Sequence, residues 1–340
     1  MSEALAVAVH LGPVKEEKFV ELIGRYAALW DALSERGARA VFTRKKDAYS
    51  PREEGQVLPV ATTYYDVQKG DDGLYSAALR TGELVVGAAL DTSGGFARYV
   101  DADRGLNPLE LRNLCRSNLG TYRLFHDMQP PSFIVTNAAE QAELDEQLAN
   151  MTSSKIVVKS NESRKGSGVR IVDRSLKAVL EVMDLRKLQD GKPHTGYLVQ
   201  KHIECASTFE GLRDKMPDRG LLAANQEGIQ LRQHMIDERS VLAIGRRLSD
   251  DEYISVEQDS VPQEVTDIGS EATRRLRAKT AATHSHVAAD SIQDANTGQY
   301  YLLEVNGAWP AFVPGKDGRE GDSRQLGEAL ATKLIAMAGA

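Results

Sequence analysis

The stretch Tyr300-Tyr-Leu-Leu-Glu-Val-Asn-Gly-Ala-Trp-Pro310 carries the most information about the fold. Its apolar run predicts a strand, and the alternation of side chains along a strand places Glu304 and Asn306 on one face. A carboxylate and an amide oxygen at this spacing can hold one hard cation together. The alternative is a plain hairpin strand whose polar residues face water.

A second carboxylate is expected beside this pair. The apolar runs Val287 to Ile292 and Gln299 to Val305 flank the turn Asp294-Ala-Asn-Thr-Gly298, which predicts two paired strands. Asp290 lies in the first of these strands. Two carboxylates and an amide oxygen that converge at sheet ends suit Mg²⁺ carrying a polyphosphate.

A glycine-containing loop is the second informative feature. Two apolar runs, Ile156-Val-Val-Lys159 and Val169-Arg-Ile-Val172, flank the polar loop Ser160-Asn-Glu-Ser-Arg-Lys-Gly-Ser-Gly168. A lysine at a strand end can bind phosphate oxygens, and a small-residue loop can offer them backbone N–H groups. The sequence contains neither a P-loop nor a dinucleotide-binding glycine motif. The alternative is an ordinary hairpin with a long solvated turn.

The third feature is a strand that runs into irregular chain. Tyr197-Leu-Val-Gln-Lys-His-Ile203 is followed by Glu204-Cys-Ala-Ser-Thr208. Backbone groups exposed where a strand ends can bind an adenine edge in the way they would pair with another strand. The alternative is a plain buried strand.

In this order and spacing, the three stretches resemble the ATP-grasp superfamily. They are most similar to its glutathione synthetase-like and ribosomal-protein glutamate-ligase-like branches, over roughly residues 107 to 330. The nucleotide-binding residues that the resemblance implies are Lys159, Gly166, Ser167, Gly168, Gln200, Lys201 and Ile203. The metal ligands that it implies are Asp290, Glu304 and Asn306, for Mg²⁺ or alternatively Mn²⁺. The catalytic residues that it implies are Arg232 and Arg247, matched through Leu231-Arg232 and Arg246-Arg247.

The resemblance also implies a reaction. ATP would phosphorylate a substrate carboxylate, and an amine would attack the acyl phosphate, with release of ADP and phosphate. The implied partners are a small-molecule or peptide carboxylate and an amine. Arg232 is expected to grip the acyl phosphate or the carboxylate, because a guanidinium fork binds either bidentately; the alternative is a surface arginine. An ATP-grasp small-molecule kinase and a nucleotide-binding module without catalysis stay open as alternative functions.

One position departs from the family pattern. Family members often carry a lysine early in the helix that precedes the glycine-loop domain, and this chain has Asn118 there. Arg116 and Arg123 are the candidates to replace it in holding the α-phosphate.

The amino-acid composition limits the class of protein and the partners to be expected. The chain has 340 residues, of which 41% are hydrophobic and 27% charged, so it is typical of globular proteins. Its net charge of -7 argues against broad nucleic-acid binding, and it has no apolar run long enough to span a membrane. Cys115 and Cys205 fit no disulfide or zinc pattern, which favours a cytoplasmic location. A homodimer is expected on general grounds alone.

The order of the patterns predicts three domains. Strands at Leu5 to Val9, Ala38 to Thr43 and Leu84 to Leu90, with a helix at Lys15 to Arg36, indicate an open N-terminal α/β (pre-ATP-grasp) domain over residues 1–105. Residues 106–195 are expected to form a small lid subdomain with the glycine loop. Residues 196–340 are expected to form the C-terminal ATP-grasp subdomain with the metal site. The fold class expected is therefore α/β, or α+β overall.

Overall fold

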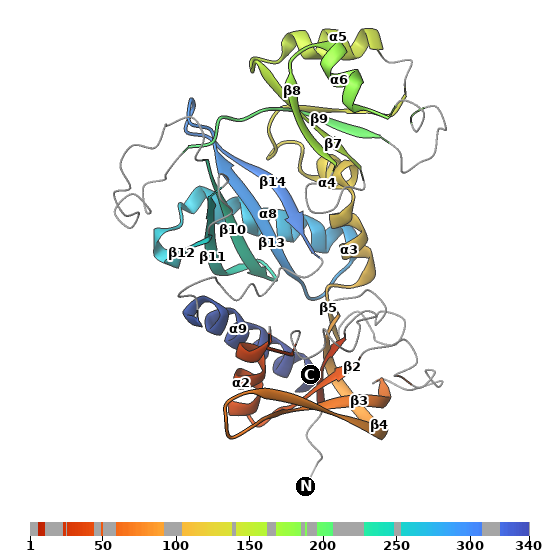
Figure 1. The fold of residues 1–340 in the computed structure, drawn as a ribbon, viewed down its shortest axis with the longest axis vertical. Helices are drawn as coiled ribbons and strands as arrows, with labels where there is room; N and C mark the ends of the chain where they lie inside the picture. Colours follow the sequence, from red (N-terminus) through yellow and green to blue (C-terminus); the bar gives the residue numbers. More distant parts are fainter. Residues whose placement is uncertain are drawn as a thin grey trace.

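The computed structural model describes residues 6–10, 23–24, 26–43, 49, 59–91, 104–137, 141–161, 168–184, 188, 196–206, 228–247, 253–307 and 320–339. These residues form helices and three sheets, which Figure 1 shows one above another along the long axis. The predicted mixed α/β fold class is confirmed.

The N-terminal sheet is built on parallel strands. Its members are β1 (Ala6–His10), β2 (Arg39–Thr43), β3 (Val60–Lys69), β4 (Tyr75–Asp91) and β5 (Gly105–Leu106). β1 runs parallel to β2 and to the second half of β4, whereas the first half of β4 forms an antiparallel hairpin with β3. The three expected strands are confirmed, and the hairpin is an addition in a region that the sequence left unassigned.

Two helices cover one face of this sheet. They are α2 (Ala27–Glu35) and α9 (Glu320–Gly339), which pack against each other. Trp30 and Leu33 of α2 share a buried core with Leu330 and Leu334 of α9 and with Phe42 of the sheet. The C-terminal helix therefore completes the core of the N-terminal part of the chain.

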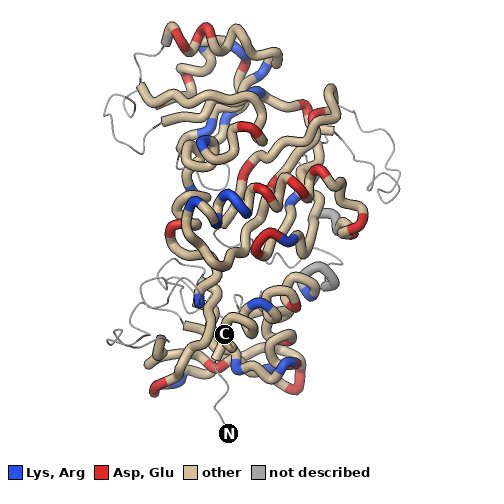
Figure 2. The backbone as a smooth tube through the Cα atoms, turned by 180° about the vertical axis from the view of Figure 1, so that it is seen from behind, with Lys and Arg blue, Asp and Glu red and all other residues tan. Residues whose placement is uncertain are grey.

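The central sheet is antiparallel, in the order β12-β11-β10-β13-β14. Its strands are β10 (Ile229–Ile236), β11 (Arg239–Arg247), β12 (Tyr253–Val256), β13 (His286–Gln293) and β14 (Tyr300–Asn306). The long helix α8 (Gln263–Thr280) packs on one face, against buried side chains such as Met235, Ala289 and Leu302. Its other face meets water, because Glu264, Asp267, Arg274 and Lys279 are exposed; Figure 2 shows the charged positions along this helix. The predicted final strand pair is confirmed as β13 and β14, and β10 and β11 form an antiparallel hairpin.

The lid sheet has the order β6-β9-β7-β8. Its strands are β6 (Ser132–Val135), β7 (Lys155–Ser160), β8 (Val169–Asp173) and β9 (Tyr197–Lys201), and its helices are α5 (Gln141–Asn150) and α6 (Leu176–Val182). The two strands expected beside the glycine loop are β7 and β8, which pair in antiparallel register. Buried apolar residues such as Ile156, Val179 and Val199 form a separate core here.

The predicted domain limits stay a proposal, and two contacts cross them. β9 pairs with β7 and β6, so the sheet of the lid extends beyond residue 196. α9 packs on α2 and β4, so the end of the chain contacts the first unit. No helix among the described residues is long and apolar enough to cross a membrane.

The chain between the N-terminal sheet and the first strand of the lid sheet contains two helices. They are α3 (Leu109–Arg116) and α4 (Asn118–Phe125). Ser117 between them is extended, and its hydroxyl accepts the N–H of Gly120, so it caps a second helix. Asn107, two residues before α3, does not cap that helix: its side-chain amide donates to the C=O and accepts the N–H of His286, at 2.6 and 2.7 Å.

Candidate active site

Three charged residues lie side by side on the central sheet, each on a different strand. Arg232 of β10 is in register with Asp290 of β13, which is in register with Glu304 of β14. Their side chains lie on the face opposite α8, because the neighbouring residues Leu231, Ala289 and Val305 are buried in cores that include helix residues. The spacing of three short sequence motifs thus produces one continuous row of charge.

Hydrogen bonds hold this row together. The Arg232 guanidinium donates bidentately to Asp290, with Nε–Oδ1 and Nη2–Oδ2 distances of 2.7 Å each. Asn306 Nδ2 donates to Asp290 Oδ2 at 3.1 Å and to Glu304 Oε1 at 3.0 Å. Asp290 is fully buried, while the Arg232 side chain keeps 17% of its surface. The predicted metal triad and Arg232 are therefore in direct contact.

The two carboxyl groups differ in their acidity. Burial raises the pKa of Asp290 to about 6, against the lowering effect of Arg232. Desolvation also acts to raise the pKa of Glu304, yet its hydrogen bonds with Asp290 and Asn306 and the charges of Lys159 and Arg232 lower it on balance. Two carboxylates this close repel each other when both are ionised, so the row favours an added cation.

These residues fit a Mg²⁺ ion. Two carboxylates and an amide are the hard oxygen ligands that Mg²⁺ prefers, and a half-turn of the Asn306 amide presents Oδ1 in place of Nδ2. The described residues contain no group of three or more His, Cys, Asp or Glu side chains that could hold a metal. Asn306 would therefore have to join the two carboxylates in the ligand set. The bound ion would supply charge neutralisation and polarisation of phosphoryl oxygens.

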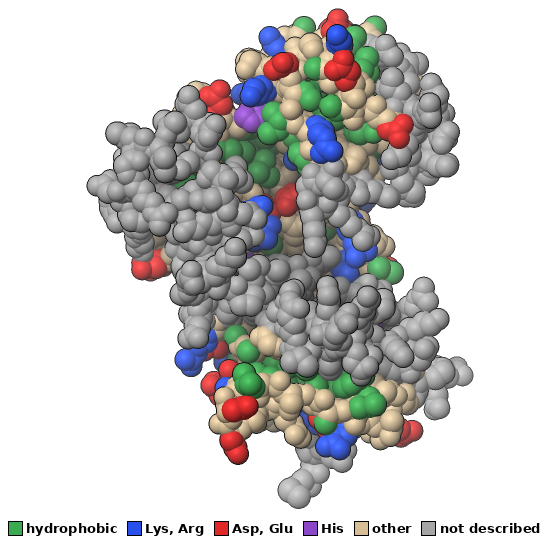
Figure 3. Space-filling view, in the orientation of Figure 1, with side chains coloured by type: hydrophobic (Ala, Val, Ile, Leu, Met, Phe, Trp, Pro, Cys, Tyr) green, Lys and Arg blue, Asp and Glu red, His purple; other side chains and the backbone are tan. Residues whose placement is uncertain are grey.

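Lys159 brings a positive charge from the lid. It lies near the end of β7, is partly buried, and interacts electrostatically with Glu304. Burial lowers its pKa, and the charge of Glu304 opposes that effect. Lys159, which belongs to the lid sheet, is therefore close enough to the predicted metal triad to interact with Glu304 through its charge. Figure 3 shows acidic and basic side chains close together between the lid and the central sheet.

The remaining predicted nucleotide residues have different surroundings. Ile203 is buried with Ile292 and Tyr301 in a small apolar cluster that follows the end of β9. Lys201 Nζ lies 3.8 Å from Asp294 Oδ2. The side chain of Gln200 is buried and donates to Ser132 Oγ at 3.0 Å, and its backbone lies in the sheet between Ser132 of β6 and Val157 of β7. Their roles in binding ATP stay predictions.

The glycine loop is anchored at its base. The N–H of Ser160 donates to the C=O of Gly168 at 3.0 Å, whereas Gly166 and Ser167 lie outside the described residues. Asn118 Nδ2 donates to the C=O of Ser160 at 2.7 Å, and the Asn118 N–H donates to the C=O of Asn161 at 3.1 Å. The residue that replaces the usual lysine thus ties α4 to the start of the loop.

A register shift decides which of the two neighbouring arginines shares a face with Arg232. β10 and β11 have a bulge between His234 and Met235, after which Arg246 pairs with Gln230 and Arg247 with Ile229. Since Gln230 shares a face with Arg232, Arg246 has the register position on that face. A hairpin without the bulge would have given that position to Arg247. Arg247 stays a prediction, and Arg246 is the arginine that sequence reasoning passed over.

Comparison with known proteins identifies this architecture. No protein-family model and no curated sequence matches the chain. Among solved structures, the ATP-grasp ligase PsnB complexed with a minimal precursor superposes with a TM-score of 0.58 at 13% identity, covering 98% of this chain and 99% of PsnB. The chain has the ATP-grasp fold.

Two further structures with this fold extend the comparison. D-cycloserine synthetase DcsG gives a TM-score of 0.56 at 14% identity, covering 97% of this chain and 99% of DcsG. The D-alanine-D-alanine ligase from Coxiella burnetii gives 0.58 at 10% identity, covering 98% and 95%. The predicted similarity to ATP-grasp ligases is thus confirmed at the level of the fold, and it extends over the N-terminal sheet as well as the region with the motifs.

Proposed function

We propose that the protein is an ATP-dependent carboxylate–amine ligase that works through an acyl phosphate. The observation that carries this proposal is the row Arg232, Asp290 and Glu304, with Asn306 bridging the two carboxylates and Lys159 of the lid sheet interacting with Glu304. The row offers oxygen ligands for Mg²⁺ and cationic groups for phosphate on one surface. The fold comparison supports it, because PsnB has also been solved with Mg and ADP.

Each group has a role in the proposed reaction. Asp290, Glu304 and Asn306 would hold Mg²⁺, which screens the negative charge of the phosphates. Lys159 would bind phosphate oxygens from the opposite side. Asp290 fixes the orientation of the Arg232 guanidinium, which would bind the reacting carboxylate or its phosphate. Such a site accelerates the reaction by positioning and by electrostatic stabilisation.

The test is a phosphate-release screen with pairs of carboxylates and amines, including small molecules and peptides. A ligase gives ADP, free phosphate and a condensed product that mass spectrometry detects, and Glu304→Ala should give none of these. A phosphorylated product without free phosphate would instead identify a small-molecule kinase. If neither product appears with any substrate and ATP still binds, the chain is a nucleotide-binding module and the ligase proposal fails.

A further inference from the structure

The N-terminal sheet contains an internal split between two of its strands. The ladder between β2 and β3 has only two pairs, Val41 with Asp66 and Phe42 with Tyr65. In the same antiparallel register, Ala40 would face Val67 and Arg39 would face Gln68, yet these pairs do not form. The two strands separate at this point instead of continuing the sheet.

Both separated segments keep their partner on the other side. Arg39 and Ala40 stay paired with β1, and Val67 and Gln68 stay paired with β4. Each segment therefore presents a backbone edge toward the split. An edge of this kind attracts another extended chain, because its N–H and C=O groups lack a ladder partner.

A cavity of about 340 Å³ occupies the split. Its walls come from the two separated segments, residues 38–40 and 66–69, and from α2, which contributes Trp30, Asp31 and Ser34. Tyr75 of β4 completes the lining. The cavity thus lies where the sheet lacks pairs between β2 and β3, and its volume is in the range of known ligand sites.

The two sides of the split differ in chemistry. Ala40 and Val67 pack toward the core that contains Trp30, so this side accepts only a small side chain. Arg39 and Asp66 alternate to the opposite side, where Arg39 Nη2 donates to Asp66 Oδ1 at 2.9 Å. Their side chains are 42% and 18% exposed, so a polar side chain has access to this pair.

Two hydrogen bonds to Asp31 of α2 lie at one end of the split. Lys69 Nζ donates to Asp31 Oδ1 at 2.6 Å, and the hydroxyl of Tyr75 donates to the same oxygen. These contacts join α2 to the tip of the hairpin and keep the helix over the cavity.

We propose that this split binds an extended segment of a polypeptide, which adds a short strand between β2 and β3. The segment would have small and polar side chains in alternation, with the small one beside Trp30. The site lies on a different sheet from Arg232, Asp290 and Glu304, so it would recruit a peptide and not react with it. The proposal does not depend on the ligase reaction.

The direct test is binding of a position-scanning library of acetylated peptides of about six residues, measured by fluorescence anisotropy without ATP or Mg²⁺. We expect at least one pool to bind below about 1 mM, and alternate N-methylation of its amides to weaken binding by about tenfold or more. Ala38→Trp, which adds bulk at the cavity wall, should abolish binding. Leu79→Trp adds the same ring to an exposed position of the hairpin outside the cavity and should retain binding.

Amide hydrogen exchange on the unmodified protein is an independent test, because it does not require Ala38→Trp to fold. The bound peptide should slow exchange in residues 38–40 and 66–69. No binding by any pool, equal binding after N-methylation, or protection elsewhere alone would overturn the proposal. Glu304→Ala should bind peptide normally, so a failed ligase assay leaves this result unaffected.

Discussion

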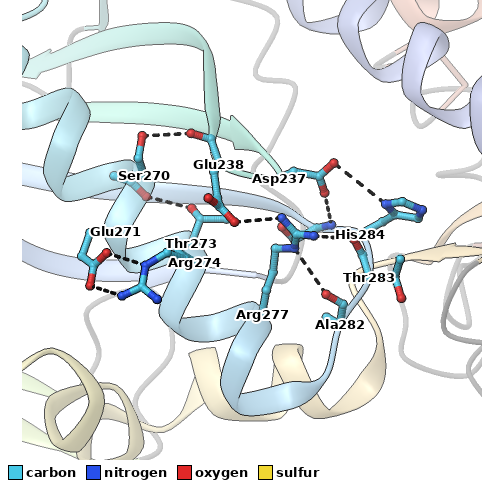
Figure 4. A network of polar contacts seen from close by, with 12 residues as sticks. Asp237, Glu238, Ser270, Glu271, Thr273, Arg274, Arg277, Ala282, Thr283 and His284 are labelled. Atoms are coloured by element: carbon cyan, nitrogen blue, oxygen red, sulfur yellow. Dashed lines mark hydrogen bonds and ion pairs between the residues drawn. The ribbon is translucent and has the colours of Figure 1, made fainter.

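Two clusters of charged side chains involve the central sheet, one in the middle of its strands and one where the turn between β10 and β11 meets α8 and α9. The first, called the row, consists of Arg232, Asp290, Glu304 and Asn306. The second, called the turn cluster, consists of Asp237, Glu238, Glu271, Arg274, Arg277, His284 and Lys333, most of which Figure 4 shows. Both are rich in hydrogen bonds, but they differ in how well their charges are balanced.

In the turn cluster, each acid has a basic partner nearby. Glu238 accepts from Arg277 at 3.0 Å, Asp237 accepts from Lys333 at 2.6 Å, and Glu271 pairs with Arg274 at 2.7 Å. Hydrogen bonds from Arg274 and Arg275 lower the pKa of Glu271 to about 2. In the row, burial raises the pKa of Asp290 to about 6. A carboxyl group whose pKa is raised by burial is typical of a functional site. A carboxyl group whose pKa is lowered by basic partners is typical of a structural ion pair.

The largest expected effect is on activity. Glu304→Gln removes one charged ligand of the proposed Mg²⁺ site, so phosphate release should fall by about 100-fold or more. The matched control is Glu238→Gln in the turn cluster, which should retain activity. Steady-state phosphate release and circular dichroism spectra measure the two effects. Equal activity losses in both variants would show that the two clusters do not differ in function.

The next effect is on stability. Arg232→Met leaves the buried carboxylate of Asp290 without its bidentate partner, so the free energy of unfolding should fall by about 3–5 kcal/mol. Arg277→Met removes a partner of Glu238, whose side chain is 47% exposed, and should cost about 1 kcal/mol. Urea unfolding of both variants makes the comparison. A small loss for Arg232→Met would mean that water already solvates Asp290.

The pH dependence of stability should have opposite signs in the two clusters. Because the folded pKa of Asp290 is raised to about 6, its stabilising contribution is present below its unfolded pKa near 3.8 and is lost as the pH rises through 6. The pKa of Glu271 is depressed to about 2, so its contribution is present above 4.5 and is lost as the pH falls toward 2.

Thermal melts in chelator separate the two contributions. The difference between wild type and Asp290→Asn should change between pH 4 and pH 6, in favour of wild type on the acid side. The difference between wild type and Glu271→Gln should change only below about pH 4.5. A flat difference for Asp290→Asn across its window would show that Asp290 is ionised throughout.

The row was largely predictable from the sequence because it depends on local rules. Alternation along a strand places Glu304 and Asn306 together, and one apolar run before Asp290 indicates the neighbouring strand. The choice between Arg246 and Arg247 was not predictable, because a single bulge between His234 and Met235 reverses which residue shares the face of Arg232.

Parts of the fold depend on contacts that no local pattern contains. The hairpin of β3 and β4 carries exposed apolar residues such as Leu74 and Leu79, so its strands lack a clean alternation of polar and apolar positions. The packing of α9 on α2 joins the two ends of the chain, and only the complete core reveals it. The hydrogen bonds of Asn107 are likewise not predictable from local sequence, since their partner His286 is distant along the chain.

The smallest expected effect concerns Asp237, which closes the turn cluster. Its φ of 53° lies in the left-handed region, which Asn also tolerates, and its Oδ1 accepts the N–H of Ser285 at 3.0 Å. Asp237→Asn can keep both features and loses the charge interaction with Lys333 and, when His284 is protonated, the one with His284, so the cost should be below about 1 kcal/mol. Because these interactions are screened by ions, the difference from wild type should shrink further in concentrated salt. Asp237→Val should cost more at any salt concentration, since a β-branched residue is strained at positive φ and cannot accept from Ser285. If the Asn variant were as unstable as the Val variant, the charge pair, and not the backbone conformation, would be what stabilises this turn.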